Sequence, residues 1–119
     1  MINEDSYFGE KTWEKAESRM QETAINKALE KAQLSSADID CIFAGDLLNQ
    51  CVGSTYGIRA LGMPFIGLFG ACSTMAESLA VSSVFLEAGA VTRAVACTSS
   101  HFCSAERQFR LPLEYGGQR

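Results

Sequence analysis

The stretch that organises the chain is residues 64–78, which read PFIGLFGACSTMAES. Its apolar run ends at Phe69 and is bounded by Pro64 and Gly70, a pattern that predicts a short buried strand. The residues after Cys72 are mostly small and predict a helix that other elements can approach closely. Cys72 is therefore expected at or next to a helix N-terminus, where the dipole and the free N–H groups favour a thiolate and can hold an oxyanion. The alternative is a small buried thiol, which is what most free cysteines are.

Size and composition limit the classes of protein to consider. The chain has 119 residues, enough for one domain at most and for a modest core. Its formal net charge is −4 and it has no run rich in Lys and Arg, so we expect no nucleic-acid partner. No apolar run approaches the roughly 18 residues needed to span a bilayer. A membrane role therefore needs a partner or a surface contact.

The cysteines and the single histidine bear on metal and redox chemistry. The five cysteines are irregularly spaced and include no Cys-x-x-Cys pair, which favours reduced thiols over a disulfide framework. His101 is the only imidazole, so we expect no metal site, and nothing in the composition indicates a cofactor. Cys41 and Cys97 are predicted to lie in core strands, while the places of Cys51 and Cys103 stay open.

Helical and strand patterns alternate along the rest of the chain. The predicted segments are a helix at 13–32, a capped turn at 35–38, a strand at 41–45, helices at 54–61 and 73–88, and a strand at 92–98. Gly62 and Gly89 are the predicted stops of the two later helices. Residues 1–11 are expected to be loose. This alternation predicts an α/β fold with a mostly parallel sheet flanked by helices.

The helix at 13–32 has two predicted faces. Thr12 is its predicted N-cap. The predicted core stripe comprises Trp13, Ala16, Met20, Ala24, Ala28 and Ala32, widened by Ile25 and Leu29. The predicted solvated face comprises Glu17, Arg19, Glu22, Lys27, Glu30 and Lys31.

Polar residues follow two predicted strands, where open α/β sheets collect ligand groups. Asp46 and Asn49 come after the strand at 41–45, and they either orient a polar ligand or cap the next helix. Residues 99–107 are predicted to form a polar loop. That loop carries Ser99 and His101, which are candidates to line a ligand pocket.

Other charged and apolar residues are open to two interpretations. Glu77 faces either a polar cleft or a partner subunit. Arg107 and Arg110 either pair with the carboxylates of a small acidic ligand or form part of a solvated surface. The alternating apolar residues Phe109, Leu111 and Leu113 are compatible with one more strand.

Several blocks together resemble a known family. They are GDLLNQ at 45–50, FGACST at 69–74, TSSH at 98–101, AERQFR at 105–110 and EYGGQ at 114–118. The strand–turn–helix elbow around Cys72 resembles that of the thiolase and β-ketoacyl synthase superfamily, and the blocks in this order resemble its stage V sporulation protein AD family. The resemblance extends from about Trp13 to the end of the chain.

The resemblance carries expectations about the fold. It implies two similar α/β halves in a layered α-β-α-β-α domain, with residues 1–119 as a single partial domain from the N-terminal half. The usual first strand of that half is not recognised, so the chain is expected to be a fragment. Open strand edges and an uncovered apolar face should make the isolated chain weakly stable and prone to self-association.

The resemblance also implies a function. The family is expected to bind dipicolinic acid and to support its uptake into the developing spore, together with other proteins of the uptake complex. The expected location is the cytoplasmic side of the forespore, peripheral to the inner spore membrane, and the full-length form is expected to be a homodimer. Cys72 then lies at the floor of the ligand cleft, and the other candidate ligand-binding residues are Ser73, Thr74, Asp46, Asn49, Ser99 and His101.

Two alternatives remain. The first is an acyltransferase of the ketosynthase or thiolase type in which Cys72 is the catalytic nucleophile. Such a nucleophile needs nearby histidines, or a histidine and an asparagine, to manage protons. The superfamily supplies these from its second half, and this chain offers only His101. The second alternative is an assembly subunit that uses the fold for contacts alone.

Overall fold

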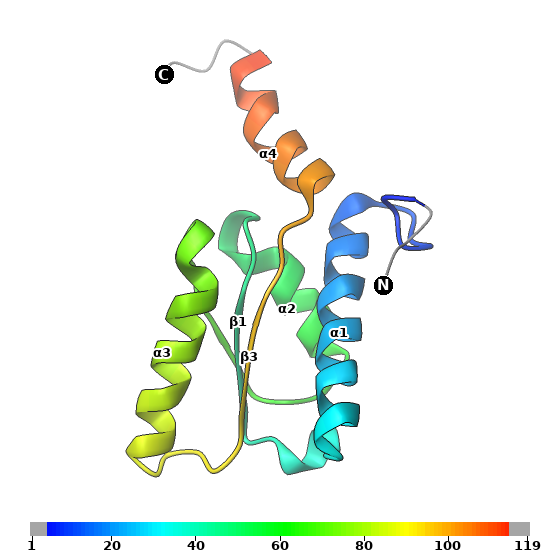
Figure 1. The fold of residues 1–119 in the computed structure, drawn as a ribbon. Helices are drawn as coiled ribbons and strands as arrows, with labels where there is room; N and C mark the ends of the chain where they lie inside the picture. The colour runs from blue at the N-terminus through cyan, green and yellow to red at the C-terminus, as the bar shows by residue number, and fades with distance from the viewer. Residues whose placement is uncertain (1–4, 115–119) are drawn as a thin grey trace.

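Helices alternate with the strands of a small sheet in the computed structural model, which describes residues 5–114 (Figure 1). The elements are α1 (Trp13–Ala32), η1 (Ser36–Asp38), β1 (Cys41–Gly45), η2 (Asn49–Cys51), α2 (Val52–Arg59), β2 (Phe65–Gly67), η3 (Ala71–Ser73), α3 (Thr74–Glu87), β3 (Ala94–Thr98) and α4 (Phe102–Glu114), where η marks a 3₁₀ turn. None of the helices in this part of the chain is long and apolar enough to cross a membrane.

The sheet has three strands in the order β2-β1-β3, and both pairings are parallel. Ile42 in the central strand lies opposite Phe65 of β2 and Val95 of β3. All five residues of β1 are buried. The predicted α/β fold, a parallel sheet flanked by helices, is confirmed.

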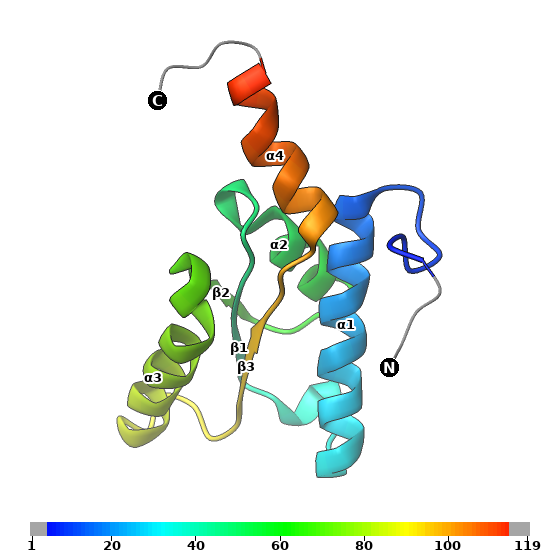
Figure 2. The same cartoon turned by 45° about the horizontal axis from the view of Figure 1, so that its top comes forward.

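The helices cover the two faces of the sheet unequally. Figures 1 and 2 show α1 and α2 on one side of β1 and β3, and α3 on the other. The core on the first side joins Ile25 and Leu29 of α1 to Ile42 of β1 and Ile58 of α2. On the other side Phe43 meets Phe85 of α3 edge-to-face, with ring centroids 5.0 Å apart.

Local signals set the ends of several elements as predicted. Thr12 Oγ1 accepts a hydrogen bond from the Lys15 backbone N–H, and Ser35 and Asp38 form a capping box. Gly62 and Gly89 follow helices with φ of +66° and +69°, values that suit glycine. The helix α2 begins two residues earlier than predicted.

The buried face of α1 differs from the prediction. Its fully enclosed side chains include Glu17, Gln21 and Ile25. Ala24, Ala28 and Ala32, which the predicted core stripe includes, are exposed. The prediction of Glu17 on the solvated face is wrong. Glu17 and Gln21 lie on the same four-residue line as Ile25, so the core-facing line begins with two polar residues.

The helix α3 buries polar groups and exposes apolar ones. Thr74, Ser78 and Ser82 are buried toward the sheet, and each of the two serine hydroxyls donates to a carbonyl of its own helix. On the outer surface Leu79 is 49% and Val84 66% exposed. The helix therefore packs on the sheet mainly through small hydroxyl residues and Phe85, and it leaves several of its apolar side chains exposed.

Two predictions near strand ends are wrong. The strand β2 is only half-buried and ends at Gly67, and Phe69 is 57% exposed, because β2 forms the edge of this sheet and has a single neighbour. The predicted polar loop at 99–107 is irregular only as far as His101, and α4 replaces both the rest of the loop and the possible strand at 109–113. Residues 105–108 (AERQ) are good helix formers, so their polarity was mistaken for a loop signal.

Candidate functional site

The elbow between β2 and α3 has the predicted form. Cys72 lies in the turn η3, directly before α3 begins at Thr74, so its predicted place beside a helix N-terminus is confirmed. It is exposed, which removes the alternative of a buried thiol. The preceding Ala71 has a φ of +49°, a left-handed conformation that a residue with a Cβ seldom adopts. A Cβ added at Gly70 would lie 2.5 Å from Ser73 Oγ and 2.6 Å from Glu77 Oε2, so the ends of these two side chains would have to move.

The hydroxyl groups at the elbow are already used within the chain. Ser73 Oγ donates to the Gly70 carbonyl at 2.7 Å, and Thr74 Oγ1 donates to the Ala71 carbonyl at 2.9 Å. Thr74 Oγ1 also accepts from the Gly70 N–H at 3.1 Å. The backbone N–H groups of Ala71 and Cys72 have no hydrogen-bond partner among the residues that the structure describes. These two amides are the donors that remain for a ligand.

Glu77 comes from the first turn of α3 and folds back toward the elbow. Its Oε2 atom is buried and has no hydrogen-bond partner within the described residues. Nearby, the Cys51 thiol donates to the Leu68 carbonyl at 3.2 Å. Burial raises the pKa of the Cys51 thiol, and the negative charges of Asp46 and Glu77 raise it further. Glu77 therefore faces the elbow, and both of its interpretations, a polar cleft or a partner subunit, stay predictions.

Asp46 acts as the cap of α2. Its Oδ2 accepts from the N–H groups of Leu48 and Gly53, at 3.1 and 3.3 Å, and its Oδ1 accepts from both the N–H and the hydroxyl of Ser54. The side chain is 1% exposed. Of the two roles considered for Asp46, capping is the one that the structure displays. Asn49 is exposed, and its backbone N–H donates to Gln108 Oε1 of α4.

Ser99 belongs to a buried polar network centred on α1. Ser99 Oγ donates to Glu17 Oε1 at 2.8 Å and accepts from Gln21 Nε2 at 2.9 Å. Gln21 Nε2 also donates to Ser54 Oγ, and Ser104 Oγ of α4 donates to Glu17 Oε2 at 2.7 Å. The network therefore joins α1 to α2, to the end of β3 and to the start of α4.

His101 is buried and both of its ring nitrogens are engaged. Nδ1 accepts from the Ser104 N–H at 3.4 Å, and Nε2 lies 2.6 Å from the Ser6 carbonyl oxygen. Because a neutral imidazole carries one N–H, Nε2 is the donor to Ser6. Within the described residues no hydrogen bond joins His101 to Cys72, so His101 is not arranged as a base for that thiol.

The candidate residues form two groups at one edge of the sheet. The elbow group is Cys72, Ser73 and Thr74, and the strand-end group is Asp46, Ser99 and His101. Both lie beyond the carboxyl ends of the strands, as predicted. The two groups come together at Gly45. Its carbonyl accepts a hydrogen bond from the Ser99 N–H, and a Cβ added at this residue would lie 2.7 Å from Thr74 Cγ2.

Other predicted residues have structural partners. Arg107 pairs with Glu14 and lies over the Trp13 ring, 5.2 Å from its centroid. Burial alone would raise the pKa of Glu14, but the hydrogen bond and charge of Arg107 outweigh it and lower that pKa. The side chain of Arg110 and residues 115–119 lie outside the described part of the chain.

The cysteine thiols differ in exposure: Cys72 is exposed, Cys103 is half-buried and the other three are buried. Cys41 and Cys97 are buried in strands, as predicted, and Cys51 is also buried. Burial raises the pKa of Cys41 and raises that of Cys97 to about 11. Among residues 5–114, no cluster of three or more His, Cys, Asp or Glu is placed to hold a metal ion.

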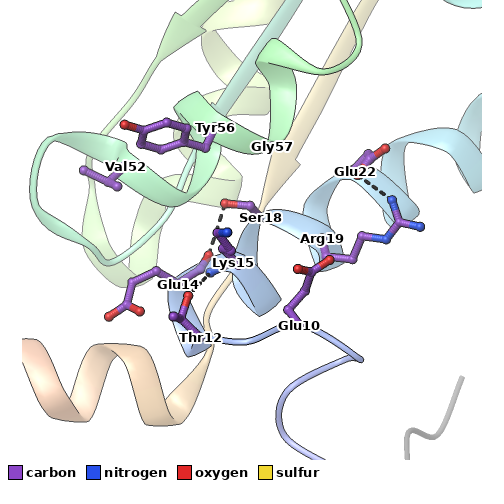
Figure 3. Close-up of a pocket in the computed structure, with 10 residues that line it drawn as sticks. All are labelled: Glu10, Thr12, Glu14, Lys15, Ser18, Arg19, Glu22, Val52, Tyr56 and Gly57. Carbon is purple, nitrogen blue, oxygen red and sulfur yellow. Dashed lines mark hydrogen bonds and ion pairs between the residues drawn. The ribbon is translucent and has the colours of Figure 1, made fainter.

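A groove of about 500 Å³ lies elsewhere, between the first half of α1 and α2 (Figure 3). Its lining residues are Glu10, Thr12, Glu14, Lys15, Ser18, Arg19, Glu22, Val52, Tyr56 and Gly57. None of the predicted site residues is among them. The groove has charges of both signs on its rim and the exposed Tyr56 ring on one wall, whereas the elbow has the free amides and the thiol.

Sequence reasoning missed the residues of α1 that organise the strand-end group. Glu17 and Gln21 were assigned to the surface or passed over, yet they continue the line of Ile25 and Leu29 at four-residue spacing. That spacing is the signal by which they could have been found.

Comparison with known proteins agrees with the sequence blocks. The family model described as "Stage V sporulation protein AD (SpoVAD)" matches residues 1–119. The chain is 50% identical over 116 residues to the "Stage V sporulation protein AD" of Bacillus subtilis (strain 168). That alignment covers 98% of this chain and 34% of the relative, so the chain spans about a third of the length of the curated relative that it matches. With the family matched along its whole length, the chain belongs to the stage V sporulation protein AD family.

Proposed function

We propose that this chain contributes a dipicolinate-binding surface to a non-catalytic, thiolase-like protein that supports uptake of dipicolinic acid into the developing spore. Membership in the family indicates a role in spore formation. The ligand, the uptake complex, the homodimer of the full-length form and the position on the cytoplasmic side of the inner spore membrane are parts of this proposal.

The observation that carries the proposal is the pair of unpartnered N–H groups at Ala71 and Cys72, beside the exposed thiol at the start of α3. Dipicolinate is a flat aromatic ring with two carboxylates, which need hydrogen-bond donors. Amides at the N-terminus of a helix are suited to a carboxylate, and the dipole of α3 adds to the attraction. Since Ser73 and Thr74 donate within the elbow, the backbone supplies the binding donors.

Calorimetric titration of dipicolinate into this chain tests the proposal. Cys72→Trp should abolish the heat of binding by filling the elbow, whereas the matched Cys72→Ser, which keeps the size of the side chain, should bind like the wild type. Circular dichroism of both variants controls for folding. No heat with the wild type, or equal heat with Cys72→Trp, contradicts the proposal for this chain.

The second candidate is acyl transfer by Cys72, favoured by its exposure at a helix start. Incubation with an acyl thioester followed by mass spectrometry separates the two candidates. A stable adduct on Cys72, absent from Cys72→Ser, supports transfer. The binding proposal predicts no such adduct, because both ring nitrogens of His101 are engaged by Ser6 and Ser104.

A further inference from the structure

We propose that Glu17 of α1 is the positioning residue of the strand-end group. By accepting hydrogen bonds from Ser99 and Ser104, it fixes the orientation of the segment between β3 and α4 and the tautomer of His101.

The two carboxylate oxygens of Glu17 are used by two different parts of the chain. Oε1 accepts from Ser99, which directly follows β3, and Oε2 accepts from Ser104 in the first turn of α4, at 2.8 and 2.7 Å. The Glu17 side chain is fully buried, so water does not compete for these oxygens. One buried acceptor therefore holds both sides of the turn that carries His101.

The tautomer of His101 follows from the hydrogen bond between Ser104 and Glu17. With the Ser104 hydroxyl held by Glu17, the N–H of the same residue faces His101 Nδ1 at 3.4 Å. Nδ1 must then be unprotonated, and the ring proton lies on Nε2, which donates to Ser6 at 2.6 Å. The path from Glu17 through Ser104 to His101 is continuous, although Glu17 does not touch the ring.

The same carboxylate fixes the polarity of Ser99. Gln21 donates to the Ser99 hydroxyl, whose own proton points to Glu17. Toward a ligand, Ser99 can then offer only a lone pair. This consequence rests on the proposed function: a dipicolinate carboxylate, which needs donors, should contact the elbow amides and not Ser99.

Nuclear magnetic resonance of the imidazole nitrogens tests the positioning role without any ligand. His101 is the only histidine, so its signals need no assignment against others. The spectra are recorded at alkaline pH, so that the two tautomers of the neutral ring are compared. The wild type should show one tautomer, with a protonated Nε2 and a bare Nδ1.

Four variants separate positioning from general stability. Glu17→Met removes both acceptors at similar size and should give mixed or exchanging tautomers. Glu17→Gln should keep the wild-type pattern, because its oxygen can accept from Ser99 while its amide donates to Ser104, whose hydroxyl can turn to the His101 carbonyl at 3.0 Å. Ser104→Ala should repeat the effect of Glu17→Met. Glu22→Gln, which alters the Arg19 pair on the same helix, is the control and should change nothing.

The tautomer pattern of the variants either supports or overturns the positioning role of Glu17. Mixed tautomers in Glu17→Met or in Ser104→Ala, with the wild-type pattern in Glu17→Gln and Glu22→Gln, support the positioning role. If Glu17→Met does not fold, Ser104→Ala gives the answer by itself. A single wild-type tautomer in every folded variant overturns the proposal.

Dipicolinate titration then separates this inference from the proposed function. If the wild type binds, Ser99→Ala should change the affinity less than about twofold, because no donor is lost, whereas loss of an elbow amide contact is worth about tenfold. A tenfold loss in Ser99→Ala overturns the assigned polarity of Ser99. No binding by the wild type sinks the proposed function and leaves the tautomer result standing.

Discussion

The helices that cover the two faces of the sheet bury different kinds of side chain. On one face α1 and α2 bury Ile25, Leu29 and Ile58 together with the polar network of Glu17 and Gln21. On the other face α3 (Figure 2) covers the sheet, where it buries Thr74, Ser78 and Ser82 and leaves apolar side chains such as Leu79 and Val84 exposed. Both faces contain buried polar groups; α3 exposes Met75, Leu79, Val84 and Leu86, whereas on the other face α2 exposes Val52 and Tyr56.

The difference shows that a side chain in this protein can be buried because it is small enough for a helix to approach the sheet closely, as well as because it is hydrophobic. The small residues Ser78 and Ser82 let α3 lie close to β1 and β3, and their hydroxyls donate to the carbonyls of Met75 and Leu79 in the same helix. Met75, Leu79 and Leu86 follow one stripe of α3 at helical spacing and are exposed, and an exposed apolar stripe of this kind is typical of an interaction surface. The contrast between the two faces can be tested by substitution, beginning with the change that should cost the most stability.

The largest effect is expected where α1 and α2 touch. A Cβ at Gly57 would lie 2.7 Å from the Ser18 carbonyl oxygen, which belongs to a helix backbone and cannot move alone. Gly57→Ala should cost about 3 kcal/mol in the free energy of unfolding, measured by urea denaturation. The control is Gly62→Ala, which meets no atom within 4 Å and should cost only about 1 kcal/mol, for its φ of +66°. Equal losses in the two variants contradict the tight α1–α2 contact.

Neighbouring residues of α3 should respond in opposite ways. Ser78→Leu forces a large side chain between α3 and the sheet and should cost about 2 kcal/mol. Leu79→Gln alters an exposed residue, so its cost should be within about 0.5 kcal/mol. Leu79→Gln should also reduce self-association, as measured by sedimentation. A large loss of stability in Leu79→Gln would show that the outer face of α3 is not free.

A smaller effect is expected in acid, at the turn that ties β1 to β3. Asp40 Oδ2 accepts from the N–H groups of Thr92 and Arg93, and these bonds lower the pKa of Asp40. Because the folded-state pKa lies below the unfolded value, this stabilisation is present above about pH 4 and is lost as the pH falls through the lowered pKa. Asp40→Asn should therefore be less stable than the wild type at pH 7, with the difference shrinking as the pH falls below about 4. A difference in stability between Asp40→Asn and the wild type that does not change with pH contradicts the stabilising role of the ionised Asp40 side chain.

The smallest effect on the fold concerns thiol labelling. Iodoacetamide should modify Cys72 first, because it is exposed, and Cys97 last, because burial raises its pKa to about 11. Peptide mass mapping over time gives the order, and unfolding in urea should equalise the rates. Faster labelling of Cys97 than of Cys72 in the native protein would reverse the assigned burial.

The parts of the fold that the sequence predicted are those with local signals. Thr12, Gly62 and Gly89 mark helix ends through capping and backbone conformation, and the strand at 41–45 is an unbroken apolar run. The place of Cys72 followed from Gly70 and the small residues after it. These features depend on neighbours along the chain, so the order of residues specifies them.

The parts that the sequence did not predict depend on neighbours in space. The four-residue spacing with Ile25 and Leu29 indicates that Glu17 faces the core. Its hydrogen-bond partners, Ser99 and Ser104, lie 82 and 87 positions further along the chain, and helical periodicity does not reveal them. The edge position of β2, and hence the exposure of Phe69, follows from strand order. Ser99 and His101 lie beyond the end of β3 as predicted, but the loop predicted for the rest of 99–107 is wrong, because a buried Ser104 and a surface Arg107 share one helix.

The most direct test of where the ligand binds is a titration of dipicolinate into ¹⁵N-labelled chain, followed by amide chemical shifts. The elbow assignment predicts the largest shifts at residues 70–74 and at Glu77, with small changes at Lys15 and Tyr56 in the α1–α2 groove. Shifts confined to the groove, or no shifts at all, would contradict the assignment of ligand binding to the elbow.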